Sequence, residues 1–268
     1  MREDIKELTE NAYRMVEEGE LREALTIFKQ ICDCRVDDAD AWMMIGAING
    51  ELGHIDEGID GLEKAISIDP GYATAHQWYG ELLAVEGQFD AALDQANLAR
   101  QADPLSPIIP FTMGWFLLYS DRQDESFAYI NEALDIDPHF ATAIGNLVVL
   151  NIMTGRYDQA RARCNQNASL ENVDPTTELA VIAAVENPAL TDQALQLLID
   201  DKQMPDGTLG KALYLMLINK PELAMDYLEK AFEAGDSYAI HIKRMGIYAP
   251  LHDKPRFQAL LAKMNMWP

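Results

Sequence analysis

The sequence predicts an all-α solenoid of stacked helix-turn-helix repeats that is closed by a C-terminal capping segment. Three observations predict it: glycines recur with a period of 34, each period divides into two helical halves, and Asp-Pro pairs end the second half. The recurring glycines are Gly19, Gly53, Gly87 and Gly155, and the slot that they skip, residue 121, holds Asp. Because a two-helix unit buries its apolar face only against its neighbours, we expect consecutive units to stack.

The period tiles residues 5–174 into five windows, which are 5–38, 39–72, 73–106, 107–140 and 141–174. In each window we expect two antiparallel helices, A and B, with the glycine between them, since a residue just past a helix end commonly adopts a positive φ. Proline then ends helix B, because it lacks a backbone donor and disfavours helical geometry in the residue before it. The pairs are Asp69-Pro70, Asp103-Pro104 and Asp137-Pro138, and Asp174-Pro175 follows a few residues late.

Small residues recur where the two helices of one pair are expected to cross. Counted within each window, the eighth slot holds Ala12, Gly46, Gly80, Gly114 and Val148, and the twentieth holds Ala24, Gly58, Ala92, Ser126 and Ala160. Small side chains allow close approach within the pair, whereas larger apolar residues on helix B, such as Phe28 and Leu62, are expected to pack against the next pair.

Beyond residue 174 the pattern continues less regularly. Residues 175–238 are expected to form two further pairs, Thr177–Glu186 with Leu190–Ile199 and Thr208–Ile218 with Glu222–Ala234. Residues 239–268 depart from the pattern and end in a predicted helix, Arg256–Met264. We interpret this segment as a cap that covers the last pair.

The windows resemble the tetratricopeptide repeat family. The second window matches its pattern at Trp42, Ile45, Gly46, Gly58, Leu62, Ala65 and Pro70, and the third at Tyr79, Gly80, Ala92, Ala96, Ala99 and Pro104. The resemblance implies a right-handed superhelix whose A helices line the concave side. Residues 228–233 and 250–261 are also similar to the closing segment of bacterial arrays attached to signalling proteins and transcription regulators.

The resemblance also implies which residues face a partner. The groove-facing slots of the A helices give the partner-binding candidates Met43, Met44, Trp78, Glu81, Phe111, Trp115, Tyr119, Asn146, Val149 and Met153. Aromatic and thioether side chains supply large, adaptable apolar area, so this set predicts a hydrophobic-aromatic peptide groove. Two alternatives stay open: the aromatic residues pack into the core, or self-association buries them.

Charge indicates what kind of partner to expect. The chain has 44 Asp and Glu against 21 Lys and Arg, a formal net charge of −23, which disfavours direct binding of nucleic acid or an anionic membrane. A protein or peptide with a basic stretch is favoured instead. A clamp for a peptide carboxylate is not expected, because Thr9 and Tyr13 occupy slots where such clamps carry Asn and Lys.

No pattern for catalysis or cofactor binding stands out. Cys32-Asp33-Cys34 is too tightly spaced for a usual zinc pair, and neither a glycine-rich phosphate loop nor a nucleophile-base arrangement is found. The charged N-terminus, short apolar stretches and three scattered cysteines predict a cytoplasmic protein without a membrane span. The sequence therefore predicts a non-catalytic protein-interaction module without cofactor or metal, the alternatives being a ligand-sensing regulatory array and a self-assembling scaffold.

Overall fold

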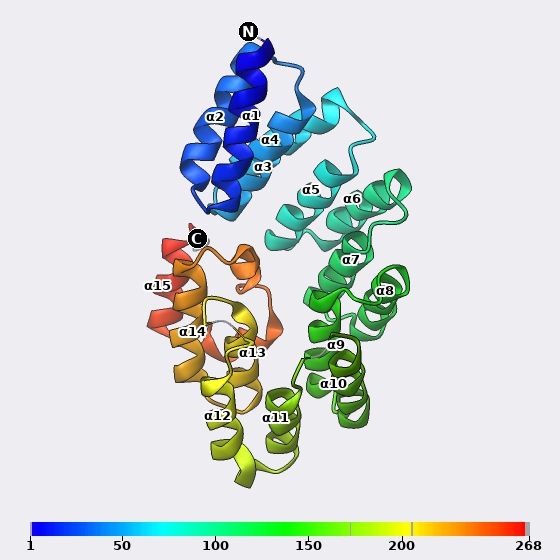
Figure 1. Ribbon diagram of the computed structural model, residues 1–268, viewed down its shortest axis with the longest axis vertical. Helices are drawn as coiled ribbons and strands as arrows, with labels where there is room; N and C mark the ends of the chain where they lie inside the picture. The colour runs from blue at the N-terminus through cyan, green and yellow to red at the C-terminus, as the bar shows by residue number, and fades with distance from the viewer. Residues whose placement is uncertain (1, 172, 205, 266–268) are drawn as a thin grey trace. The chain divides into compact units, whose positions relative to one another are not determined.

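The chain folds into helices that pack in consecutive antiparallel pairs (Figure 1). The computed structural model describes residues 2–171, 173–204 and 206–265, and all regular elements in these ranges are helical. The all-α class and the pairwise packing predicted from the sequence are thus confirmed. The predicted cap ends in residues 266–268, which lie outside the described residues.

The pairs follow the predicted order along the chain. The first pairs are α1 (Arg2–Glu17) with α2 (Leu21–Cys34), α3 (Ala39–Glu51) with α4 (Ile55–Ile68), and α5 (Ala73–Val85) with α6 (Phe89–Ala102); α7 (Ile108–Tyr119) and α8 (Gln123–Ile136) come next in the chain, and then α9 (Ala141–Met153) with α10 (Tyr157–Glu171). They are followed by α11 (Thr176–Glu186) with α12 (Thr191–Asp200) and α13 (Leu209–Leu217) with α14 (Pro221–Glu233). A 3₁₀ turn, Pro188–Leu190, precedes α12, and the 3₁₀ helices Ser237–His241 and Gly246–Leu251 lead to α15 (Pro255–Lys263).

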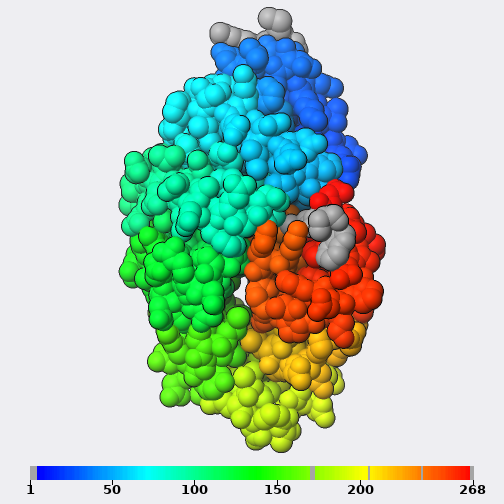
Figure 2. Space-filling view, turned by 180° about the vertical axis from the view of Figure 1, so that it is seen from behind, coloured from blue at the N-terminus to red at the C-terminus, as the bar shows by residue number. Residues whose placement is uncertain are grey.

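The chain divides into two compact units. Unit 1 comprises residues 1–122 with 261–268, and unit 2 comprises residues 123–260. Within each unit, pairs that are neighbours in the chain are neighbours in space, as the gradual colour change from blue to cyan in unit 1 and from green to yellow in unit 2 shows (Figure 2). Each unit is therefore a stack of helices that are consecutive in the chain, with α1 to α7 in unit 1 and α8 to α14 in unit 2.

In several pairs, a residue with positive φ closes the turn between the two helices. After α3 it is Gly53, with φ of 76°, where His54 N–H donates to Asn49 O at 2.8 Å. After α7 the same role falls to Asp121, with φ of 60°. The turn is therefore preserved in the window whose glycine is missing, although a left-handed conformation is costly for a residue with a side chain.

Glycines allow α3 and α4 to cross at backbone contact. A Cβ atom added at Gly46 would lie 2.8 Å from Gly58 O, and one added at Gly61 would lie 2.9 Å from Gly46 N. Real Cβ atoms essentially never come under 3.0 Å of another heavy atom. The close approach predicted for the small-residue slots is thus seen at Gly46 and Gly58.

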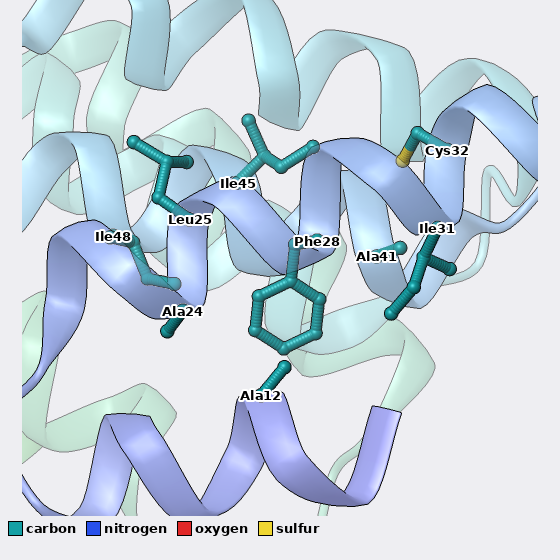
Figure 3. Close-up of a cluster of buried hydrophobic side chains, with 9 residues drawn as sticks. All are labelled: Ala12, Ala24, Leu25, Phe28, Ile31, Cys32, Ala41, Ile45 and Ile48. Carbon is teal, nitrogen blue, oxygen red and sulfur yellow. The ribbon is translucent and has the colours of Figure 1, made fainter. Parts of the chain in front are cut away.

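The core at the N-terminal end of unit 1 is built around Phe28. Its ring, from α2, points at Ala12 of α1, and the side chain is fully buried (Figure 3). The surrounding buried side chains are Ala12, Ala24, Leu25, Ile31, Cys32, Ala41, Ile45 and Ile48. Because these come from α1, α2 and α3, the cluster joins the first pair to the second.

One carboxylate links the A helices of unit 1. Asp40, in the first turn of α3, accepts hydrogen bonds from Tyr13 OH at 2.6 Å and from Tyr72 OH at 2.7 Å. Tyr13 belongs to α1, and Tyr72 immediately precedes α5. Burial, with the hydrogen bond to Asp40 next in importance, raises the pKa of both phenols well above its ordinary value, so they remain donors.

In unit 2, exposed ion pairs join successive parts of the helical stack. Asp124 Oδ1 lies 2.8 Å from Arg156, whose guanidinium also covers the Phe127 ring at 4.2 Å. Asp192 lies 3.7 Å from Lys220. Both aspartates are at least nine-tenths exposed, so each pair contributes at most about 1 kcal/mol.

Candidate functional site

The predicted partner-binding residues are carried by A helices of both units. Unit 1 holds Met43 and Met44 on α3, Trp78 and Glu81 on α5, and Phe111, Trp115 and Tyr119 on α7; unit 2 holds Asn146, Val149 and Met153 on α9. The candidates therefore form one group in each unit.

The rings of the three aromatic residues of α7 contact one another in series. The Phe111 and Trp115 ring centroids are 5.8 Å apart, and Trp115 meets Tyr119 edge to face at 5.6 Å. Phe111 is only 1% exposed and Trp115 7%, whereas Tyr119 is half-buried. Nine of the twelve residues of α7 are buried, as expected for a helix that is apolar all round. Phe111 and Trp115 are therefore core residues in this structure.

The face formed by α3 and α5 is more open. Met44 and Trp78 occupy the sixth slots of neighbouring windows and are both half-buried, and their helices are in contact. Met43, in contrast, is 5% exposed and belongs to the core. The partner-binding role of the predicted set thus stays a prediction, which depends on its half-buried members.

Two glutamates lie on this α3–α5 face. Glu81 is 9% exposed, and its Oε1 accepts a hydrogen bond from Gln77 Nε2 at 3.0 Å. Burial, assisted by the negative charge of Glu81, raises the pKa of Glu51 to about 7. Near neutral pH the Glu51 carboxyl is therefore about half protonated.

Glu51 was not among the predicted residues. It is the last residue of α3 and occupies the thirteenth slot of its window, which is a groove slot in the family pattern. Its slot would have identified it, but its raised pKa depends on burial and on Glu81, neither of which a single sequence reveals.

On α9 of unit 2 the predicted residues share one face at spacings of three and four. Asn146 Nδ2 donates to Thr142 O of its own helix at 2.8 Å. Val149 is half-buried, and Met153 is 39% exposed. This face offers an exposed thioether and an amide that already donates one hydrogen bond to its own helix.

The two buried thiols are poorly suited to nucleophilic chemistry. Burial raises the pKa of Cys32 to about 11 and that of Cys164 to about 12, so both stay protonated at neutral pH. Cys34 is exposed, and all three cysteines are free. In the described part of the chain, no three His, Cys, Asp or Glu side chains come together as they would around a metal ion.

None of the described helices combines the length and apolar character that a membrane span requires.

Comparison with known proteins agrees with this geometry. Residues 39–72, the α3–α4 pair with its flanking residues, match the tetratricopeptide repeat family. No curated protein sequence matches the chain significantly.

Solved structures share the fold at low sequence identity. A tetratricopeptide repeat protein from Parabacteroides merdae matches with a TM-score of 0.61 and 17% identity, over 91% of this chain and 98% of its own. PilW, a type IV pilus biogenesis factor, matches with a TM-score of 0.64 and 20% identity, over 73% of this chain and 93% of its own. Pseudomonas aeruginosa pilF matches with a TM-score of 0.61 and 15% identity, over 78% of this chain and 96% of its own.

These similarities establish a tetratricopeptide-type fold of stacked helical pairs. The resemblance of the C-terminal segment to arrays of signalling regulators has no counterpart among them.

Proposed function

We propose that this chain is a non-catalytic interaction module that binds a protein or peptide segment on the A-helix faces of its repeats. The observation that carries the proposal is the α3–α5 face, where half-buried Met44 and Trp78 accompany Glu51 and Glu81. Large, adaptable apolar side chains next to a few polar groups are typical of peptide-binding surfaces. Met153 and Asn146 on α9 extend the proposal to unit 2.

The partner is expected to carry a basic stretch. The net charge of −23 attracts cationic segments, with screening over about 10 Å at 0.1 M salt. We place the module in the cytoplasm, since its three free cysteines suit a reducing compartment.

The proposal is tested by isolating partners with the intact chain and measuring the affinity of synthetic peptides from the recovered protein. Replacing Met44 and Trp78 together by Ala should weaken the binding of the peptide at least tenfold, because truncating a hot-spot residue at the centre of an interface costs about 2 kcal/mol or more. The matched control is Leu98→Ala on helix B of the third pair, where the side chain is 43% exposed.

Equal affinities of the double variant and the unaltered protein, with unchanged helical circular dichroism, would contradict a binding role for the α3–α5 face. Sedimentation of the chain alone examines self-association at the same time. If the unaltered chain forms a dimer and the Met44/Trp78 variant does not, the occupant of this face is a second copy of the chain and not a peptide.

A ligand-sensing array is the second candidate function. It is favoured by a hollow of about 460 Å³ in unit 1, lined by residues 87–91, Ser120 and Arg122. This volume suits a small molecule. A thermal-shift screen of metabolites tests it, and a stabilising compound whose effect disappears in Arg122→Ala would support sensing over peptide binding.

A further inference from the structure

Two neutral phenols hold the carboxylate of Asp40 in place in unit 1. Its Oδ2 accepts from Tyr13 OH at 2.6 Å, and its Oδ1 accepts from Tyr72 OH at 2.7 Å. Burial raises the pKa of both phenols well above the ordinary value, and the hydrogen bond to Asp40 raises it further. Because the phenols keep their protons, they orient the carboxylate without balancing its charge.

In the described part of the chain, no lysine or arginine is paired with Asp40. Two other aspartates, Asp38 and Asp69, act on Tyr72 through their charge. Asp38 lies 3.1 Å from Arg35, and Asp69 is exposed and accepts from a backbone N–H of its own turn at 3.0 Å. Asp40 is half-buried, so its charge is partly removed from water and has no counter-ion among the described residues.

This group of side chains lies at the edge of the A-helix face. Tyr13, Asp40 and Tyr72 are all half-buried, so each retains some contact with solvent. Asp40 occupies the second slot of its window, which is a groove slot in the family pattern. Met44 follows it by four residues on α3, so the two side chains are neighbours on one face of the helix. The Asp40 carboxylate therefore adjoins the apolar part of the α3–α5 face.

The chemistry of the group favours a guanidinium ion as its ligand. Each oxygen of a carboxylate has a second lone pair, so both oxygens of Asp40 are able to accept one more hydrogen bond. A guanidinium matches a carboxylate with two parallel N–H donors, and its weak hydration suits a partly buried position. The net charge of −23 adds a long-range attraction for cations.

We propose that the Asp40 carboxylate, held by the two phenols, is the subsite for an arginine side chain of the partner. Met44 then contacts an apolar side chain of the same segment. The inference rests on the proposed function, because it specifies the partner of the same face. Four residues of α3 rise by about 6 Å, and an extended segment advances about 3.3 Å per residue. A partner segment along α3 therefore carries arginine and the apolar residue two positions apart.

Two tripeptides test the charge requirement with the intact chain: acetyl-Arg-Gly-Leu-amide and the same peptide with citrulline, which is similar in shape but neutral. The methyl resonance of Met44 reports binding. The arginine peptide should bind about tenfold more tightly than the citrulline peptide, as for a half-buried ion pair. Raising the salt concentration to about 0.5 M should weaken the arginine peptide alone.

Asp40→Asn should abolish the preference for arginine over citrulline. Asp60→Asn is the matched control, since it removes the same charge from an exposed position on α4 of the same unit and should leave the preference intact. Helical circular dichroism of both variants checks that they are folded. The comparison of the two peptides in the unaltered chain needs no variant, so it decides the proposal even if Asp40→Asn unfolds.

A peptide library with a fixed leucine and randomised neighbours tests the spacing. Peptides captured by the unaltered chain should be enriched in arginine two positions from the leucine, and those captured by Asp40→Asn should not. Captured peptides without a basic preference would overturn the Asp40 subsite and still support the proposed function. An arginine preference that persists at full affinity when Met44 and Trp78 are replaced by Ala would support the subsite and contradict the α3–α5 face.

Three further results would overturn the subsite. The first is equal affinity of the arginine and citrulline peptides for the unaltered chain, and the second is no shift of the Met44 signal by either peptide up to about 10 mM. The third is self-association of the chain that the arginine peptide reverses, because the arginine would then come from a second copy of the chain and not from another partner.

Discussion

Replacing Gly61 by Ala introduces one methyl group where α4 touches the backbone of α3. The new Cβ would lie 2.9 Å from Gly46 N, 3.0 Å from Gly46 Cα and 3.2 Å from Trp42 O. All three neighbours are backbone atoms, so no side-chain rotation relieves the contact. The two helices must therefore move apart along their crossing.

The expected cost follows from two opposing effects. Alanine is favoured over glycine inside a helix by about 1 kcal/mol. Overpacking commonly costs about 1–3 kcal/mol, and the upper end applies here because the opposing atoms are backbone. We expect a net destabilisation of about 2 kcal/mol, which for a chain of this size lowers Tm by about 4–8 °C.

Thermal unfolding followed by far-ultraviolet circular dichroism measures this change. The control is Gly145→Ala in α9, where no atom lies within 4 Å of the added Cβ. That variant should gain about 0.5–1 kcal/mol from helix propensity alone. If Gly61→Ala were as stable as Gly145→Ala, the close crossing of α3 and α4 would be wrong.

Two further predictions concern turn residues and the buried glutamate. Asp121→Gly should stabilise the chain by up to about 1 kcal/mol, because Asp121 adopts φ of 60°. Gly155→Ala should destabilise the chain by about 1 kcal/mol, because Gly155 adopts φ of 71° with open space around it. In urea titrations the free energies of unfolding of the two variants should change equally in opposite directions, and changes of the same sign would contradict the turn geometry. Glu51→Gln tests the raised pKa: because the folded state holds the proton up to about pH 7, ionisation costs stability as the pH rises from about 4.5 to 7. The variant should therefore gain no more than about 3 kcal/mol at pH 8 and little at pH 4, and a gain independent of pH would refute the assignment.

The paired helices were predictable because their signals are local. A glycine or Asp121 closes the turn in each of the five windows, and proline follows helix B in the second, third and fourth, so spacing locates these elements. Asp121 illustrates the strength of the period, because the turn survives there without glycine.

The candidate site was less predictable, because exposure depends on what packs opposite each slot. Phe111 and Trp78 are both aromatic residues in groove slots, yet Phe111 is 1% exposed and Trp78 is half-buried. A repeat pattern does not record what packs opposite each slot. Glu51 was not predictable for the related reason that its chemistry arises from burial.

The carboxylate of Asp40 has a mechanical consequence for unit 1. It accepts hydrogen bonds from Tyr13 of the first pair and from Tyr72, which immediately precedes the third pair. A force applied to α1 is therefore transmitted through one side chain to the start of α5. The first three pairs should consequently bend as a single stiff segment, and flexing under load should begin at joints that lack such a shared acceptor.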